Sequence, residues 1–446
     1  MLNPVLIPII ASAGILLGGN GMLGTLVTVR ANMEGFSATQ IGLLGTGYFL
    51  GFMVGCFITP TMIRRAGHIR VFAGLAASGA ICALGLILIV DPWLWILLRC
   101  LTGVAFCGTA MVVESWLNEI AAHGNRGQIL SVYRIVDLSA VTGGQFLLPL
   151  IGAGTFEIFA VNAILFCAAV LPVSLSALSS PAPPENTRLR PRVMWAISPV
   201  ASVGVVTVGL ANGAFRAVGP LYAQRMGLGV DRVALFMSLG IFAGVVFQYP
   251  LGWLSDRVGR RTVLIIATLG AAAASMLLAN SGVEMIYPGI FLFGGFAMPL
   301  YSLSVAHAND YAKPGQHLEL SAGLILFFSI GAALGSLVVS VLINQFGPRA
   351  FFLYTSTIHL CFVVFVVYRI TRRAAVPREL RGRFVALLRT SPLNLDLSRG
   401  ERLPVPVDEE PRRWSPILTL TICAPGATPS SSGCPGKWAA AMPATW

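Results

Sequence analysis

Long apolar stretches recur along this chain, and each is about as long as a helix that crosses a lipid bilayer, which takes roughly 20 residues. Hydrophobic residues make up 56% of the 446 residues and charged residues 11%, against about 25% charged in a soluble domain. Inside lipid, backbone polar groups must pair within their own segment, which helices achieve. The pattern predicts an all-α membrane protein with twelve spanning helices, at residues 5–29, 39–62, 71–91, 93–113, 128–151, 155–178, 195–220, 231–254, 262–281, 285–306, 320–344 and 349–370.

Basic residues gather in alternate loops between these stretches. Loops rich in arginine and lysine stay on the cytoplasmic side of a membrane, so we expect this set of loops and both termini to be cytoplasmic. The chain has no Asn-x-Ser/Thr glycosylation acceptor, which favours a bacterial inner (plasma) membrane. The net charge of +12 arises largely in these loops and the tail, so we expect no nucleic-acid partner. The loops predicted to be cytoplasmic hold Arg64, Arg65, Arg70, Arg126, Arg188, Arg190, Arg192, Arg257, Arg260, Arg261 and Lys313, and the opposite loops hold Arg30, Arg225, Arg232 and Arg349.

The two halves of the chain repeat each other without a gap. Asn20 and Gly21 recur as Asn212 and Gly213, an offset of 192 residues. We therefore expect two six-helix halves in parallel orientation, with a site near the membrane midplane between them. The predicted parts are residues 1–178, a cytoplasmic linker at 179–194, residues 195–370, and a cytoplasmic, disordered tail at 371–446. The same offset pairs Gly35 with Gly227, Leu43 with Leu235, Arg65 with Arg257, Gly67 with Gly259, Val71 with Val263, and Gly143 with Gly335.

A short basic hairpin, GWLSDRVGRR at residues 252–261, separates two apolar stretches. It resembles the signature loop between helices two and three, and again eight and nine, of the major facilitator superfamily. The twelve stretches, the central linker and the repeat agree with this resemblance over residues 5 to 370. The segments VVESWLNEIA (112–121) and VAHANDYAKPG (305–315) are most similar to bacterial members with no assigned substrate.

The resemblance implies that the hairpin around Asp256 latches the cytoplasmic side in one state and opens in the other. Physical reasoning adds a close helix approach at Gly252, a tight turn at Gly259, and lipid headgroup contacts for the arginines. A fixed topology anchor with no switching role is the alternative. The basic residues of this predicted gate are Arg257, Arg260 and Arg261.

The first half holds a degraded copy of the hairpin, PTMIRRAGHI at residues 60–69. Arg64 stands where the other copy has its acid, while Arg65 and Gly67 remain. Arg64 therefore needs an acid from elsewhere, and Glu114 and Glu119 near the end of the fourth helix are the candidates.

Charged residues at membrane depth are costly and are candidates for function. Asp137 lies near the middle of the fifth helix, and Arg134 is one turn away. We expect Asp137 to carry a proton or contact substrate, or else to form a static pair with Arg134. By resemblance, Arg99 corresponds to a fourth-helix arginine used in coupling, and the alternative is an arginine that reaches the headgroups. Arg216 is expected near the outer surface.

Amide side chains form a further group of candidates. Asn20 and Asn212 are related by the repeat, and such amides either bind substrate or bridge helices. Gln145 and Gln248 are candidates of the same type. A row of glycines at four-residue spacing, Gly47, Gly51 and Gly55, predicts a close helix contact, either a sliding surface against the other half or static packing.

These features predict a secondary active transporter of a small organic solute that works by alternating access and is coupled to protons. Export of amphipathic compounds and a non-transporting membrane sensor on the same fold are the alternatives. No nucleotide-binding motif or nucleophile arrangement stands out, so we expect neither ATP hydrolysis nor enzyme activity. We expect no cofactor or metal, contact with membrane lipids, a monomer, and a neutral or singly charged solute.

Overall fold

The structure is a computed structural model that describes residues 6–121, 126–176, 181, 191–312, 317–372 and 384. All of these lie in one compact unit that ends at Gly400. Most of the predicted linker and nearly all of the predicted tail lie outside the described residues, so the expected disorder of the tail stays a prediction. Residues 191–194, which we placed in the linker, belong to a short helix.

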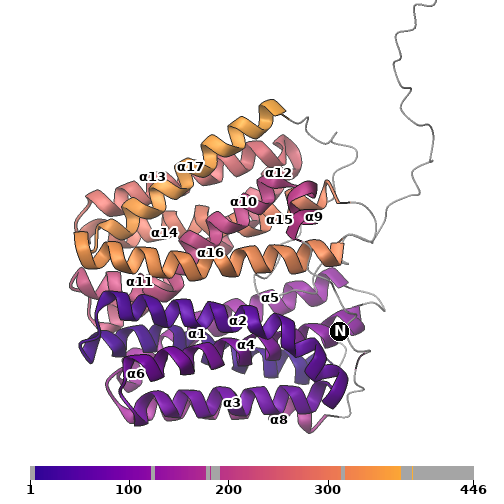
Figure 1. The fold of residues 1–446 in the computed structure, drawn as a ribbon, viewed down its shortest axis with the longest axis vertical. Helices are drawn as coiled ribbons and strands as arrows, with labels where there is room; N and C mark the ends of the chain where they lie inside the picture. Colours follow the sequence, from indigo (N-terminus) through magenta and orange to yellow (C-terminus); the bar gives the residue numbers. More distant parts are fainter. Residues whose placement is uncertain are drawn as a thin grey trace, which may run out of the picture. The chain divides into compact units, whose positions relative to one another are not determined.

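The first half consists of six spanning segments that run back and forth (Figure 1). Two of them are interrupted: the fifth breaks after Gln145 and the sixth after Ala168. Their helices are α1 (Leu6–Met33), α2 (Ala38–Ala66), α3 (His68–Leu88), α4 (Pro92–Ala121), α5 (Arg126–Gln145) with α6 (Leu147–Ile151), and α7 (Phe156–Ala168) with α8 (Leu171–Ser174).

The second half repeats this arrangement, but its seventh segment contains a π turn, its tenth segment is broken, and its last two segments are continuous. The short helix α9 (Pro191–Ile197) leads into it. The helices are α10 (Pro199–Val208), the π turn η1 (Gly209–Gly213) and α11 (Ala214–Arg225), then α12 (Val230–Val258), α13 (Arg260–Asn280), the 3-10 turn η2 (Val283–Met285) with α14 (Ile286–Ala297) and α15 (Leu300–Asn309), α16 (His317–Phe346) and α17 (Ala350–Arg372).

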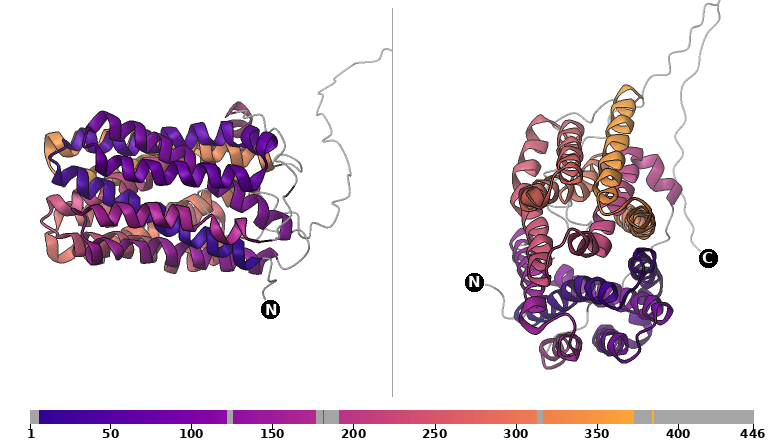
Figure 2. Two further views of the ribbon diagram at one scale, coloured as in Figure 1. Left: turned by 90° about the horizontal axis from the view of Figure 1, so that it is seen from below. Right: turned by 90° about the vertical axis from the view of Figure 1, so that its left-hand side faces the viewer.

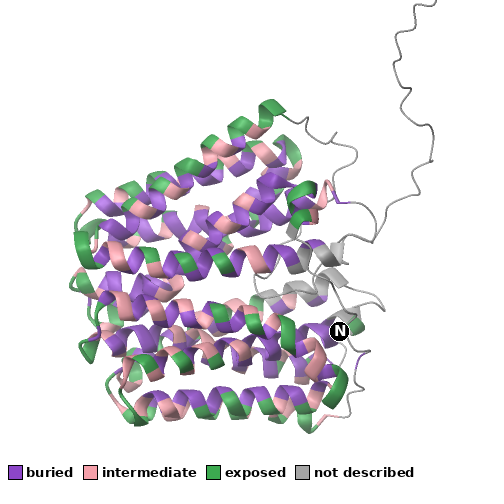
Figure 3. Cartoon of the chain, in the orientation of Figure 1, coloured by how far each residue is buried: buried purple, intermediate pink, exposed green. Residues whose placement is uncertain are grey.

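The described helices confirm the predicted fold class. Eleven of them are long and apolar enough to cross a membrane, and a shorter apolar helix at Ile135–Ile151 supplies the remaining span. Large apolar side chains such as Leu150, Leu175 and Val364 are exposed on the outside of the bundle, where lipid would cover them. Figure 3 shows the complementary pattern, with buried residues on the faces that the helices turn toward one another.

The internal repeat is visible in the helix bounds. Both ends of α2 and of α3 recur in α12 and α13 at the offset of 192 residues. One glycine joins each pair of helices, Gly67 at φ 80° and Gly259 at φ 124°, a conformation that residues with a side chain rarely adopt. The predicted loops were too long, because both helices continue past the apolar stretch into the charged residues.

The glycine row on α2 packs against α4 of the same half. A Cβ atom added to Gly51 would collide with the carbonyl oxygen of Cys100, and one on Gly47 would lie 2.9 Å from the carbonyl oxygen of Ile96. Gly103 of α4 approaches the backbone of α2 in the same way. The static packing interpretation is therefore right for this row, and the interpretation as a sliding surface against the other half is wrong.

We call the end of the bundle that carries Arg64 and Arg260 the basic end, and the other end the opposite end. In Figure 2, the right-hand view along the helices shows the first-half helices grouped apart from those of the second half. Close contacts between the halves gather toward the opposite end. There Thr28 Oγ1 donates to the carbonyl oxygen of Ala217 at 2.8 Å, and Thr46 Oγ1 donates to that of Ala333 at 2.9 Å.

Small residues of α2 and α16 make this contact close. A Cβ on Gly42 would collide with Ser340, and one on Gly45 would lie 3.1 Å from the Cβ of Ser336. The two halves are therefore in close contact at the opposite end, and the site lies deeper, beyond these contacts.

Candidate functional site

A cavity of about 130 Å³ lies between the two halves. Residues of α1, α2, α4 and α5 line it from the first half, and residues of α11, α12 and α16 line it from the second, together with Met298 between α14 and α15. The lining residues are Leu17, Asn20, Gly21, Gly24, Thr25, Gly45, Tyr48, Phe49, Phe52, Arg99, Phe106, Asp137, Leu138, Val141, Gln145, Arg216, Ala217, Met237, Ile241, Gly244, Val245, Met298 and Phe328.

Three charged side chains line this cavity, two from the first half and one from the second: Arg99, Asp137 and Arg216. Asp137 lies eleven residues after the start of α5, roughly 16 Å along the helix at a rise of about 1.5 Å per residue. The side chain of Arg134, its predicted partner, lies outside the described residues. Asp137 thus lines the same cavity as Arg99 and Arg216, two residues that the sequence did not connect with it.

Arg99 is buried, with 6% of its surface exposed. Its guanidinium lies over the ring of Tyr48, 4.6 Å from the ring centre, a favourable cation–π contact. Its Nε and Nη1 atoms have no hydrogen-bond partner among the described residues. The alternative in which Arg99 extends to the headgroups is therefore wrong, since a headgroup contact requires an exposed guanidinium.

Arg216 was expected near the outer surface, and the structure places it in the cavity wall instead. The helix continues to Arg225, five residues beyond the predicted end, so Arg216 lies roughly 14 Å inside at about 1.5 Å per residue. The π turn at Gly209–Gly213 also inserts an extra residue and rotates the side chains that follow it. The repeat could have predicted this position for Arg216. Gly24 is the equivalent residue of the first half, and it also lines the cavity.

Two amides of the first half lie in the cavity wall. Asn20 Nδ2 donates to the Tyr48 hydroxyl at 3.3 Å, and Gln145 Nε2 donates to the carbonyl oxygen of Gly21 at 3.0 Å. Gln145 Oε1 is buried and has no partner among the described residues. Asn20 Oδ1 also lies 3.4 Å from the Tyr48 hydroxyl, so the amide with capacity for a further hydrogen bond is that of Gln145.

Asn212 and Gln248 do not line the cavity, so the substrate-contact interpretation fails for them in this structure. Asn212 Nδ2 donates to the carbonyl oxygen of Ala297, the last residue of α14, at 2.9 Å. Gln248 Nε2 donates to Ser302 Oγ of α15 at 3.0 Å. Both bridge helices around the break at Met298 and Pro299, where a helix loses regular backbone pairing.

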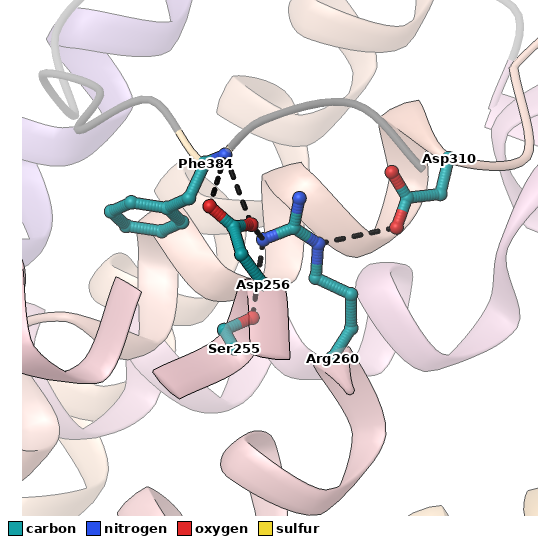
Figure 4. Close-up of polar contacts among 5 residues, drawn as sticks. All are labelled: Ser255, Asp256, Arg260, Asp310 and Phe384. Atoms are coloured by element: carbon teal, nitrogen blue, oxygen red, sulfur yellow. Dashed lines mark hydrogen bonds and ion pairs between the residues drawn. The ribbon is translucent and has the colours of Figure 1, made fainter. Parts of the chain in front are cut away.

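A charged cluster surrounds Arg260 at the basic end (Figure 4). Arg260 Nη1 lies 2.7 Å from Asp256 Oδ1, and Arg260 Nε lies 3.2 Å from Asp310 Oδ2. Arg260 Nη1 also donates to Ser255 Oγ at 3.2 Å. Arg260 is 4% exposed, so the two carboxylates supply the charge that a buried guanidinium requires.

A residue of the tail region closes this cluster from outside. The backbone N–H of Phe384 donates to both carboxylate oxygens of Asp256, at 3.1 Å each. Gly252 lies against the Phe384 ring, and a Cβ there would collide with it. The close approach predicted at Gly252 is thus to an aromatic ring of the tail region.

The other basic residues of the hairpins make local contacts. The Arg257 guanidinium lies 3.9 Å from the ring centre of Trp253, and Arg261 Nη2 donates to the Tyr311 hydroxyl at 2.7 Å. In the first half, Arg64 is exposed and donates to Thr61 Oγ1 at 2.9 Å, whereas Glu114 is buried at 3% exposure. The expected pairing of Arg64 with Glu114 or Glu119 is absent among the described residues, because Arg64 points away from the bundle. Arg65 is likewise exposed.

The described residues include no group of three or more His, Cys, Asp or Glu side chains that could hold a metal ion.

Two six-helix halves around a central cavity that holds charged side chains are the architecture of a membrane transport protein. The sequence model of the Major Facilitator Superfamily matches residues 9–247 and 201–430, and the chain belongs to this superfamily. The predicted resemblance is thereby confirmed. Members of this superfamily are transporters and not enzymes, which also confirms the expectation of a non-enzymatic, multi-pass membrane protein.

Two similar bacterial proteins carry no substrate in their names. An uncharacterized MFS-type transporter of Yersinia pestis (strain Pestoides F) is 25% identical over 351 residues, which cover 78% of this chain and 91% of that protein. Another, of Enterobacter sp. (strain 638), is 25% identical over 352 residues with the same coverage.

Solved structures share the fold at lower identity. The nucleoside transporter NupG superimposes with a TM-score of 0.72 at 12% identity, covering 83% of this chain and 100% of that one. A D-xylose–proton symporter superimposes with a TM-score of 0.61 at 15% identity, covering 83% and 98%. At these identities the similarity supports the arrangement of helices only. The nature of the solute has to be inferred from the residues that line the cavity.

Proposed function

We propose that this protein is a secondary active transporter that moves a small organic solute by alternating access. The observation that carries the proposal is the cavity between the halves, in which Arg99 and Asp137 of one half meet Arg216 of the other. A solute bound there touches both halves, so its binding energy changes when the halves rock against each other.

Proton coupling is assigned to Asp137. It is the one carboxylate among the described lining residues, and a carboxylate can take up a proton on one side of the membrane and release it on the other. Protonation removes its charge from a cavity that also holds two guanidinium groups. The proton and the solute then influence each other through the same small group of charges.

The cluster around Arg260 is proposed to act as the gate at the basic end, with Asp256, Asp310 and the Phe384 N–H as its partners. The contacts join α12, α13 and α15 of one half into one body. By the positive-inside rule, we propose that this end and both termini face the cytoplasm, and that the protein lies in the inner membrane of a bacterium. In the other half, Gly67 makes the turn between helices, and Arg64 and Arg65 lie in the last turn of α2 before it.

The test of this proposal is a flux assay on the purified, full-length protein in liposomes that contain a pH-sensitive dye. Neutral sugars, nucleosides and small organic acids are added outside, and the internal pH is followed against protein-free liposomes. We expect at least one solute to move protons only when the protein is present. Movement of a labelled solute without protons would contradict the coupling, and no movement of any solute would favour the membrane-sensor alternative.

A further inference from the structure

The guanidinium of Arg99 is a buried cation with unused hydrogen-bond donors. The residue is 6% exposed, and neither Nε nor Nη1 has a partner among the described residues. Arginine stays charged at any physiological pH, so it cannot lose its charge to reduce the cost of burial. A buried charge requires a counter-charge or hydrogen bonds. The ring of Tyr48 supplies only a weak attraction on one face.

The described lining of the cavity has an excess of positive charge. Arg99 and Arg216 contribute two positive charges, and ionised Asp137 contributes one negative charge. A solute that carries a negative charge would therefore supply the counter-charge that Arg99 lacks. A neutral solute would leave this guanidinium uncompensated, and a cation would be repelled.

The rest of the wall is apolar and partly aromatic. Phe52, Phe106 and Phe328 line it, and Asn20 and Gln145 add isolated polar atoms. The volume of about 130 Å³ is close to that of an engineered apolar protein cavity of about 150 Å³ that holds a benzene ring. The space thus fits an apolar body of about one ring beside the charged group.

We infer that the solute is a small organic monoanion, a monocarboxylate whose carboxylate binds the Arg99 guanidinium and whose apolar body packs on the aromatic wall. Carboxylate oxygens suit the planar donor groups of arginine. The second arginine, Arg216, lies on the other half, so an anion held near both draws the halves together. This inference rests on the proposed function in taking the cavity as the substrate site.

The test is a binding measurement by calorimetry on the purified, full-length protein in detergent. The probes are benzoate and butyrate, each compared with its uncharged amide, benzamide and butyramide, at pH 7. We expect at least one acid to bind tenfold or more tightly than its amide. A hydrogen bond to a charged group changes affinity by about this factor. This comparison uses the unmodified protein and does not depend on whether a variant folds.

The matched variants are Arg99→Gln and Arg232→Gln, the second of which removes an exposed arginine of α12 outside the cavity and outside the charged cluster. We expect Arg99→Gln to weaken binding of the acid at least tenfold, Arg99→Lys to retain part of it, and Arg232→Gln to leave it unchanged. Acids that bind no better than their amides, or that bind Arg99→Gln unchanged, would overturn the inference.

The two proposals fail in different ways. A neutral solute that is transported while no acid binds would remove the anion site and leave the transporter. An acid that binds through Arg99 while no solute crosses the membrane would leave the anion site and remove the transport proposal.

Discussion

In the variant Asp137→Asn, accumulation of solute against its gradient is expected to disappear while exchange down the gradient continues. Asparagine keeps nearly the size of aspartate and removes the group that binds a proton. The cavity contains no other carboxylate among its described lining residues, so no neighbour can take over. Without a proton to couple, the halves can still rock with solute bound. The measurement is uptake driven by a pH gradient, compared with counterflow of labelled solute, in the same liposomes.

The control for this variant is Asp231→Asn, which removes an exposed carboxylate at the start of α12, outside the cavity. We expect both activities to stay near the level of the unmodified protein. Equal loss of uphill and downhill transport in Asp137→Asn would mean that Asp137 holds the structure or binds solute without carrying a proton.

Substitution of Gly51 by alanine is expected to destabilise the protein by roughly 1–3 kcal/mol, the usual cost of forcing an extra carbon into a packed interior. The added Cβ would collide with the carbonyl oxygen of Cys100, a backbone atom that cannot rotate away. Helices α2 and α4 must therefore separate, and their contact is the most extensive in the first half. The measurement is the melting temperature of the purified variant in detergent.

Gly74→Ala is the matched control, since Gly74 lies in α3 and a Cβ there meets nothing within 4 Å. We expect no loss of stability, because alanine favours a helix over glycine by about 0.5–1 kcal/mol. If Gly51→Ala melts at the same temperature as Gly74→Ala, the close contact of α2 with α4 does not exist as described.

The apolar stretches and the repeat were sufficient to predict the fold. Both signals extend over many residues, so a change at any single position does not obscure them. The helix ends were harder to place. Asp256 and Arg260 lie within helices and not in a loop, since polarity marks where the lipid ends and not where the helix ends.

The site was predicted only in part. Asp137, Arg99, Asn20 and Gln145 stood out as polar residues in apolar stretches, and all four line the cavity. Arg216 was missed, and for Asn212 the helix-bridging alternative is the one observed, because a π turn and a longer helix changed which side chains face the centre. The partner of Asp256 in the tail region, Phe384, could not be found from sequence, since no local pattern links residues so far apart.

Alternating access requires the halves to separate at the opposite end, and a covalent link between the halves there tests this requirement. The variant combines Gly45→Cys with Ser336→Cys, whose Cβ atoms would lie 3.1 Å apart, slightly closer than the roughly 3.8 Å of an average disulfide. Ala217→Gly makes room, since a Cβ on Gly45 would otherwise meet Ala217. The eight native cysteines are replaced by alanine.

The matched control keeps only Cys56 and Cys107, which lie on α2 and α4 of one half with their Sγ atoms 3.2 Å apart. Solute flux is measured after oxidation and again after reduction. We expect the link between Gly45→Cys and Ser336→Cys to stop flux and reduction to restore it, while the link within one half leaves flux unchanged. Undiminished flux with the two halves fully linked would contradict alternating access in this protein.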